Sequence, residues 1–266
     1  MSYSVLFRQF PLDQLDVLAP VVAQTLGITI FDARTKIRKG WGFLEREVTE
    51  EESRRIVESM GDVAGGVVAV ENAQLRKPVA PKVITGFDPT ENGMTLRLQS
   101  PQEPPLPVEW TQVAVVAAGG FTEDTILHET GGKDRETAQM MIGLGIFLVT
   151  GIPSGIFGGK KKKKEEKPVK SSRVITFGRL IIESGEQFAF SPDHFDYSGL
   201  GAKKQFNARL NFRAVLQEFA QSPSARLNLG ARLLFDNRSL TFANYTGFHD
   251  FEAELLWLTN VPPAAA

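Results

Sequence analysis

The sequence holds one local cluster of histidine with carboxylates, Asp193-His194-Phe195-Asp196. Such groups serve in general acid–base catalysis and as metal ligands. In a strand or turn with alternating faces, however, Phe195 and Tyr197 point opposite to His194 and Asp196. This alternation favours a structural role. An enzyme site assembled from distant residues around Asp193, His194 and Asp196 remains an alternative hypothesis.

Two further motifs imitate functional sites but lack required residues. The stretch 154–161 resembles a phosphate-binding loop, yet Ser154 stands where that loop needs glycine and Lys161 where it needs serine or threonine. Ser198 lacks the glycine that precedes a nucleophile by two positions in hydrolases. We therefore predict a protein that is not an enzyme, with no catalytic, cofactor-binding or metal-binding residues and no cofactor.

Composition excludes several classes of function. The chain has 266 residues, no cysteine and a formal net charge of −1. Disulfides, thiolate nucleophiles and cysteine metal sites are therefore excluded. Nucleic-acid binding is not expected, because a global basic field is absent and Phe212 of the basic–aromatic stretch 203–213 falls on a predicted buried stripe. The first residues show no secretory signal pattern, so the expected location is cytoplasmic.

The most unusual segment is 140–159, which has twenty residues without a charge and is followed by five lysines. Its length approaches that of a membrane span, although glycines lower its hydrophobicity. A loop or short buried helix, a membrane-docking or partner-binding arm, and a true span all remain open. An arm would place the protein peripheral to the inner membrane. The possible interaction residues are Ile146, Phe147, Leu148, Val149, Ile152, Ile156, Phe157, Lys160, Lys161, Lys162, Lys163 and Lys164.

The N-terminal part alternates between predicted strands and helices. The expected elements are a strand at 3–8, helical segments at 12–26 and 29–37, a strand at 43–48, a helix at 50–60 and a strand at 67–70. Pro20 should kink or split the first helix. Thr49 and Glu52 form a capping box for the third. The order β-α-α-β-α-β predicts a ferredoxin-like sandwich over residues 1–77.

The remainder is predicted to be a β-rich domain over residues 82–260, interrupted by an insertion at 131–170. A polar segment with two prolines, 76–81, separates it from the first domain. Expected strands are 82–87, 94–98, 110–118, 122–130, 172–183 and 187–191, followed by a helix capped by Asn207 and a last helix at 249–259. These elements predict a barrel or curled sheet closed by C-terminal helices, so the fold class is α+β.

The N-terminal domain resembles the C-terminal domain of the bacterial ribosomal stalk protein. The likeness lies in the stretches Thr25 to Arg34, Thr49 to Ser53 and Gly65 to Val70. The resemblance implies the ferredoxin-like fold and, in that family, binding of translation factors through basic residues on the first two helices. Here no lysine or arginine occurs between Arg8 and Arg34. We therefore expect the fold without the factor binding.

The β-rich domain weakly resembles a bacterial pleckstrin-homology-like domain. The lipid-binding members of that fold carry basic residues around the first hairpin loop. The corresponding loop here, Asp88 to Gly93, is acidic and would repel an anionic headgroup. The resemblance therefore implies a fold and no lipid site.

Together, these observations predict a non-enzymatic binding, adaptor or regulatory protein with a protein partner. A membrane-associated protein that docks through 140–164 is the alternative hypothesis, and an enzyme is a second alternative. The oligomeric state is left open.

Overall fold

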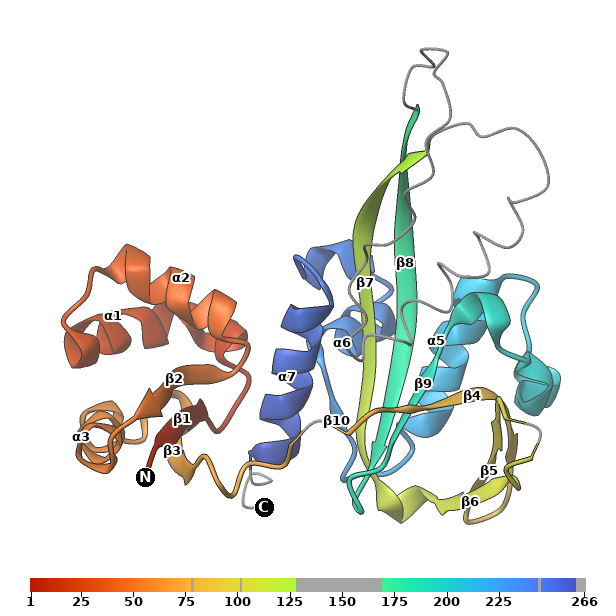
Figure 1. Cartoon of the computed structure of the whole chain (residues 1–266), viewed down its shortest axis with the longest axis horizontal. Helices are drawn as coiled ribbons and strands as arrows, with labels where there is room; N and C mark the ends of the chain where they lie inside the picture. Colours follow the sequence, from red (N-terminus) through yellow and green to blue (C-terminus); the bar gives the residue numbers. More distant parts are fainter. Residues whose placement is uncertain (78, 101, 128–168, 244, 262–266) are drawn as a thin grey trace, which may run out of the picture.

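The computed structural model describes residues 1–77, 79–100, 102–127, 169–243 and 245–261. For 122–127 and 169–173 it describes the backbone alone. Helices and sheets both occur, so the predicted α+β class is confirmed. A small sheet with three helices precedes a larger sheet with the remaining helices (Figure 1).

The N-terminal part has the predicted order β-α-α-β-α-β. Its elements are β1 (Tyr3–Phe7), α1 (Leu15–Leu26), α2 (Ile30–Gly40), β2 (Phe43–Val48), α3 (Glu50–Met60) and β3 (Val67–Glu71). β1 is the central strand, and both of its neighbours pair with it antiparallel. The apolar faces of the three helices pack on one side of this sheet around Val5, Leu18 and Ile56. The ferredoxin-like assignment itself stays a prediction.

Local capping residues set the ends of these helices. Thr29 accepts a hydrogen bond from the Asp32 amide at the start of α2, and Thr49 and Glu52 form the predicted capping box of α3. Of the two expected effects of Pro20, a kink or a split, the split is wrong, because α1 continues through Pro20. The break lies instead at Gln14, where a 3-10 turn ends. Pro20 is exposed, so the carbonyl group left without its helical partner lies on the solvent side.

The larger sheet has seven strands in the order β10-β7-β8-β9-β4-β5-β6. They are β4 (Lys82–Pro89), β5 (Gly93–Leu98), β6 (Leu106–Glu109), β7 (Val113–Leu127), β8 (Val169–Ile182), β9 (Gln187–Phe190) and β10 (Arg226–Leu227). The helices are α5 (Ala208–Phe219), α6 (Leu229–Phe235) and α7 (Phe248–Asn260). Two neighbouring pairs, β4–β9 and β10–β7, are parallel. The pleckstrin-homology-like assignment stays a prediction.

β7 is a single strand, whereas two strands were expected over 110–130. Gly119 and Gly120, which fall between the two expected strands, lie inside it. A Cβ atom on Gly119 would lie 2.4 Å from the Phe177 ring, and one on Gly120 would lie 3.0 Å from Leu240 Cβ. The glycines therefore make room for neighbouring side chains and do not turn the chain.

The larger sheet has a hydrophobic core on each face. Along β7, Val116 and Ala118 contribute to one core, while Val115 and Ala117 contribute to the other. The first core lies under α5 and includes Phe212 and Phe219, and the second lies under α7. This alternation is the two-residue period of a strand buried on both sides.

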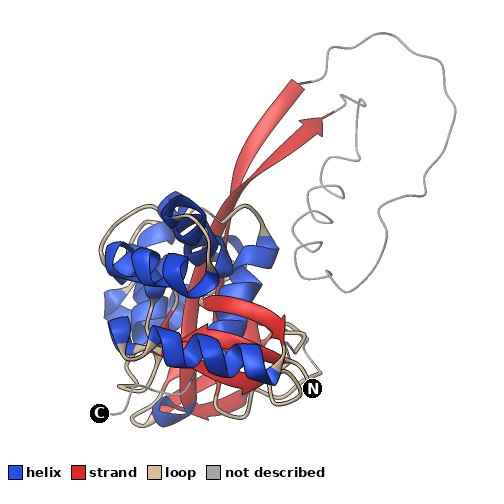
Figure 2. Cartoon of the chain, turned by 90° about the vertical axis from the view of Figure 1, so that its left-hand side faces the viewer, coloured by secondary structure: helices blue, strands red, loops and turns tan. Residues whose placement is uncertain are grey.

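β7 and β8 form an arm at their distal ends. Their antiparallel pairing runs from Val113 opposite Ile182 to Leu127 opposite Val169. The inner half lies between the two cores, and the outer half extends beyond the body of the protein (Figure 2). The predicted insertion at 131–170 follows this arm, and 128–168 lie outside the described residues.

The core under α7 is shared by both parts of the chain. It includes Leu6 and Trp41 from the N-terminal part together with Trp257 from α7. Trp257 Nε1 donates a hydrogen bond to the Phe7 carbonyl oxygen at 2.8 Å. α7 lies between the small sheet and β7 (Figure 1). The predicted boundary near 77–81 falls between β3 and β4, in a segment without helix or strand, but apolar packing crosses it.

Candidate functional site

The predicted interaction segment lies outside the described residues. This concerns every residue named for it, Ile146 to Phe157 and Lys160 to Lys164, and also the imitation of a phosphate-binding loop at 154–161. Membrane docking through 140–164 therefore stays a prediction. In the part of the chain that the structure describes, no single helix is long and apolar enough to cross a membrane; the bent pair Pro11–Leu26 and Ile30–Gly40 meets those two criteria together.

The Asp193-His194-Asp196 cluster does not converge on a common site. Asp193 and His194 lie in a 3-10 turn and Asp196 caps the next one. As expected, Phe195 and Tyr197 are buried while His194 and Asp196 are exposed. Among the described residues, no group of three or more histidine, aspartate or glutamate side chains is arranged to hold a metal ion.

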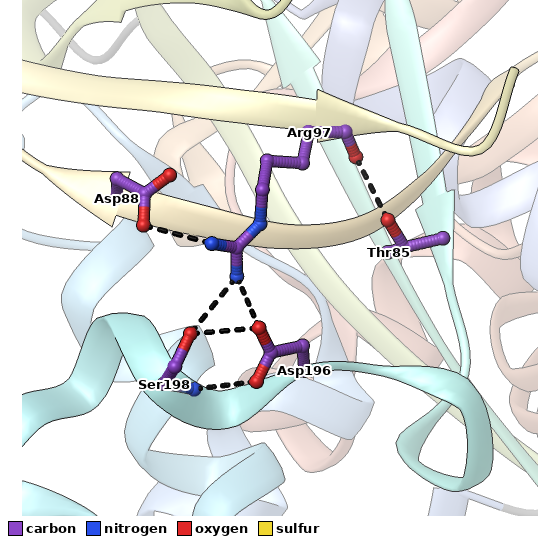
Figure 3. Close-up of polar contacts among 5 residues, drawn as sticks. All are labelled: Thr85, Asp88, Arg97, Asp196 and Ser198. Atoms are coloured by element: carbon purple, nitrogen blue, oxygen red, sulfur yellow. Dashed lines mark hydrogen bonds and ion pairs between the residues drawn. The ribbon is translucent and has the colours of Figure 1, made fainter. Parts of the chain in front are cut away.

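Asp196 instead belongs to an ion-pair cluster around Arg97, which no sequence pattern indicated (Figure 3). The Arg97 guanidinium donates to Asp88 at 2.9 Å and to Asp196 at 2.7 Å. Ser198 Oγ donates to Asp196 at 2.7 Å. These contacts connect the β4–β5 hairpin to the turn that follows β9, 99 residues further along the chain.

The surroundings of Asp196 in this cluster favour its ionised form. Hydrogen bonds from Ser198, and then the charge of Arg97, lower the pKa of Asp196. A carboxylate with a lowered pKa is a weak base, so it does not activate the neighbouring Ser198 hydroxyl as a nucleophile. The Arg97 cluster therefore acts as a structural clamp.

Substitutions separate a clamp from a catalytic cluster. Asp196→Ala should lower the free energy of unfolding by about 1 kcal/mol, because it removes hydrogen bonds from Arg97 and Ser198. His194→Ala should change it by less than about 0.5 kcal/mol, because this exposed side chain lies outside the clamp. Urea unfolding of both variants measures the difference. Equal losses would contradict the clamp.

A cavity of about 410 Å³, the α7 pocket, lies between α7, the β8–β9 turn and the side chains of Arg76, Lys77 and Val79. Ile181, Leu255 and Leu256 line it with apolar surface. Glu252, Gln187 and Arg76 contribute polar groups. A concave surface that combines apolar side chains with polar and charged ones can serve as a small-molecule site.

A buried ion pair fixes one wall of the α7 pocket. Arg179 is 2% exposed and donates to Glu252 Oε1 at 2.6 Å. Burial raises the pKa of Glu252 and lowers the pKa of Arg179, while the attraction between the two charges opposes both shifts. The pair joins β8 to α7, so it holds the Glu252 carboxylate in place beside the cavity.

Two polar side chains near this wall have incomplete hydrogen bonding. Within the described part of the chain, Arg179 Nε and Nη1 and Gln187 Oε1 are buried without a hydrogen-bond partner. Gln187 is 7% exposed and lines the α7 pocket. Buried polar atoms normally have partners, and an unsatisfied one often marks a place where a water or ligand binds.

The chain was compared with family models, curated proteins and solved structures. None of them matches it. The resemblances to the ribosomal stalk protein and to pleckstrin-homology-like domains therefore stay predictions.

A second polar network lies deeper in the core. Glu254 on α7 is fully buried and accepts hydrogen bonds from the Tyr245 hydroxyl and, at 2.8 Å, from the Leu229 amide. Asn228 donates to the Tyr245 oxygen at 2.9 Å. Burial raises the pKa of Glu254 to about 7, against the opposing effect of these hydrogen bonds. The network joins α6 to α7, and none of its four residues lines the α7 pocket.

The remaining sequence candidates have structural positions. Phe212 is 1% exposed and belongs to the core under α5, as expected. Lys203 pairs with Glu218 at 2.5 Å. His249 lies at the start of α7 beside Asp250, at 3.2 Å. Nothing in these positions assembles a reactive group.

Proposed function

We propose that this protein is a non-enzymatic, ligand-binding regulatory protein and that it binds at the α7 pocket. The observation that carries the proposal is a cavity partly lined by apolar side chains that also holds a fixed carboxylate, Glu252, and the unsatisfied buried amide oxygen of Gln187. Such a combination of shape and polar groups gives a site both affinity and specificity.

The position of the pocket supports a regulatory role. One wall is the segment after β3, where the Arg76 amide donates to Asn260 Oδ1 of α7 at 2.7 Å. The opposite walls are α7 and the β8–β9 turn. A ligand here contacts the connection between the two parts of the chain and the helix they share. Binding would therefore stabilise their association, by linkage.

The chemistry of the described residues supports a non-enzymatic role. The carboxylate of Glu252 is paired with Arg179, and the Ser198–Asp196 pair lies in the Arg97 clamp. The Ser198 hydroxyl lies beside the Asp196 carboxylate, but the lowered pKa of Asp196 makes it a weak base, and covalent catalysis needs a base that activates the nucleophile.

A blocking substitution tests the proposal. Val79 lines the α7 pocket and is 54% exposed, so Val79→Trp should fill the mouth of the cavity without burying new polar groups. We expect fragments that bind the wild-type protein in a ligand-observed NMR screen to lose affinity at least tenfold in this variant.

Val17→Trp is the matched control, because Val17 is 57% exposed and lies on α1, outside the pocket. It should leave binding unchanged. Fragments that bind wild type, Val79→Trp and Val17→Trp equally would overturn the α7 pocket as the binding site. Turnover of a bound compound would overturn the non-enzymatic role.

A further inference from the structure

Gln187 defines the polar requirement of the α7 pocket. It lies on β9 opposite Ile181 of β8, so both side chains project to the face of the sheet that α7 covers. The side chain is more than nine-tenths buried, and no described residue donates to its Oε1 atom. The last torsion of a glutamine is broad and roughly two-fold, so a half-turn exchanges the amide nitrogen with this oxygen and presents the oxygen to the cavity.

Glu252 adds a second hydrogen-bond acceptor to the same cavity. Its Oε1 atom accepts from Arg179, which holds the carboxylate in position. A carboxylate accepts about four hydrogen bonds, so this pair does not saturate it. Gln187 and Glu252 therefore both favour a ligand that carries a hydrogen-bond donor.

The charges around the cavity favour a neutral ligand. Arg76 and Lys77 line it, as do Glu183, Glu186 and Glu252. Two of the acidic residues have cationic partners, since Lys82 pairs with Glu186 at 3.0 Å and Arg179 with Glu252. A singly charged ligand would meet charges of its own sign here, and its desolvation is costly.

We propose that the α7 pocket binds a small, neutral, amphipathic molecule of the carboxamide or urea class, with an N–H donor directed at Gln187 and Glu252 and an apolar body against Ile181, Leu255 and Leu256. This inference rests on the proposed function and specifies the ligand. The apolar wall supplies affinity in proportion to buried area. The two acceptors select the donor, because a ligand without one leaves them unpaired.

Two probes of equal shape test the donor requirement. Hexanamide and heptan-2-one share a five-carbon chain and a carbonyl group, and differ by an amide NH₂ in place of a methyl group. Apolar burial alone favours the ketone. We expect the wild-type protein to bind hexanamide at least fivefold more tightly, measured by chemical-shift titration.

Gln187→Met identifies the group responsible. Methionine keeps the length of the side chain and removes the acceptor, so the preference for hexanamide should fall to twofold or less. Its melting temperature should equal or exceed that of the wild type, because the substitution removes an unsatisfied buried atom. A clear fall in melting temperature would show that this oxygen has a partner in the protein and would overturn the proposal.

The outcomes also separate this inference from the proposed function. If both probes bind equally and Val79→Trp blocks both, the pocket stands and the ligand class is wrong. If hexanamide is preferred in wild type and in Gln187→Met alike, Gln187 does not select the donor, and the proposal is overturned. If Val79→Trp affects neither probe, the pocket itself is wrong.

Discussion

Between pH 5 and pH 8, the free energy of unfolding should fall by about 2 kcal/mol more in the wild type than in Glu254→Gln. The pKa of Glu254 is about 7 in the folded protein and about 4.5 for an ordinary glutamate. The folded state therefore binds more protons between these values, and stability falls as pH rises from about 4.5 to about 7. A neutral glutamine has no proton to lose.

The cause of this pH dependence is the closed surroundings of the carboxyl group. Glu254 receives hydrogen bonds from Tyr245, Leu229 and, at 3.4 Å, Asn228, and the positive charge of Arg232 also favours its ionised form. Burial outweighs these effects together. The ionised form is therefore the costly one, despite three donors.

Urea unfolding at pH 5, 6, 7 and 8 measures the effect as the difference between wild type and variant. The difference removes the contributions of other titrating groups, such as Asp250, whose pKa is lowered. Glu91→Gln, at an exposed position, is the control for the change of charge alone. A difference that stays constant across this pH range would contradict the raised pKa of Glu254.

Trp257→Ala should lower the free energy of unfolding by about 3 to 5 kcal/mol. Trp257 is 3% exposed, packs against Phe10 at 5.9 Å between ring centroids, and donates to the Phe7 carbonyl. The substitution leaves a cavity and a carbonyl without its donor at the contact between the two parts of the chain. Both parts should be destabilised together.

Circular dichroism and tryptophan fluorescence during urea unfolding measure this loss, and the two signals should follow one transition in the wild type. Phe206→Ala is the control, because Phe206 is 95% exposed and should contribute less than about 0.5 kcal/mol. Gly42→Ala tests the same contact from the N-terminal part. Gly42 has a φ of +92°, and a Cβ atom there would lie 2.1 Å from the Trp257 ring. A loss below 1 kcal/mol in Trp257→Ala would show that the two parts are stabilised independently.

The elements of the N-terminal part were predictable because their signals are local. The apolar spacing of the helices and the Thr49–Glu52 capping box lie within a few residues of one another. The same local reasoning was wrong over 110–130, where it divided one strand into two on either side of Gly119 and Gly120. Whether a glycine turns the chain or makes room for a ring depends on Phe177 and Leu240, which lie far away in sequence. The short α6 was missed for a similar reason, since its cap Asn228 bonds to Ala118 on β7.

The α7 pocket was not predicted, although the sequence contains a signal for it. Arg179 is a single charge within the apolar stretch 174–182, and burial of such a residue requires a partner. That partner, Glu252, lies 73 residues away on a helix whose spacing indicated only a buried face. The ion pair and the unpartnered Gln187 oxygen could not be predicted without the relative positions of β8, β9 and α7.

Alternate side chains of β7 contribute to opposite cores, and this determines where the chain tolerates insertions and deletions. Deleting one residue between Val115 and Ala118 would exchange the side chains of the two cores, because each position would move to the opposite face. A change in length between Leu127 and Val169 leaves the register of the described pairs intact, because it falls outside them. The entropic cost of closing a loop grows only slowly with its length. Reporter domains or affinity tags should therefore be accepted there and rejected a dozen residues earlier.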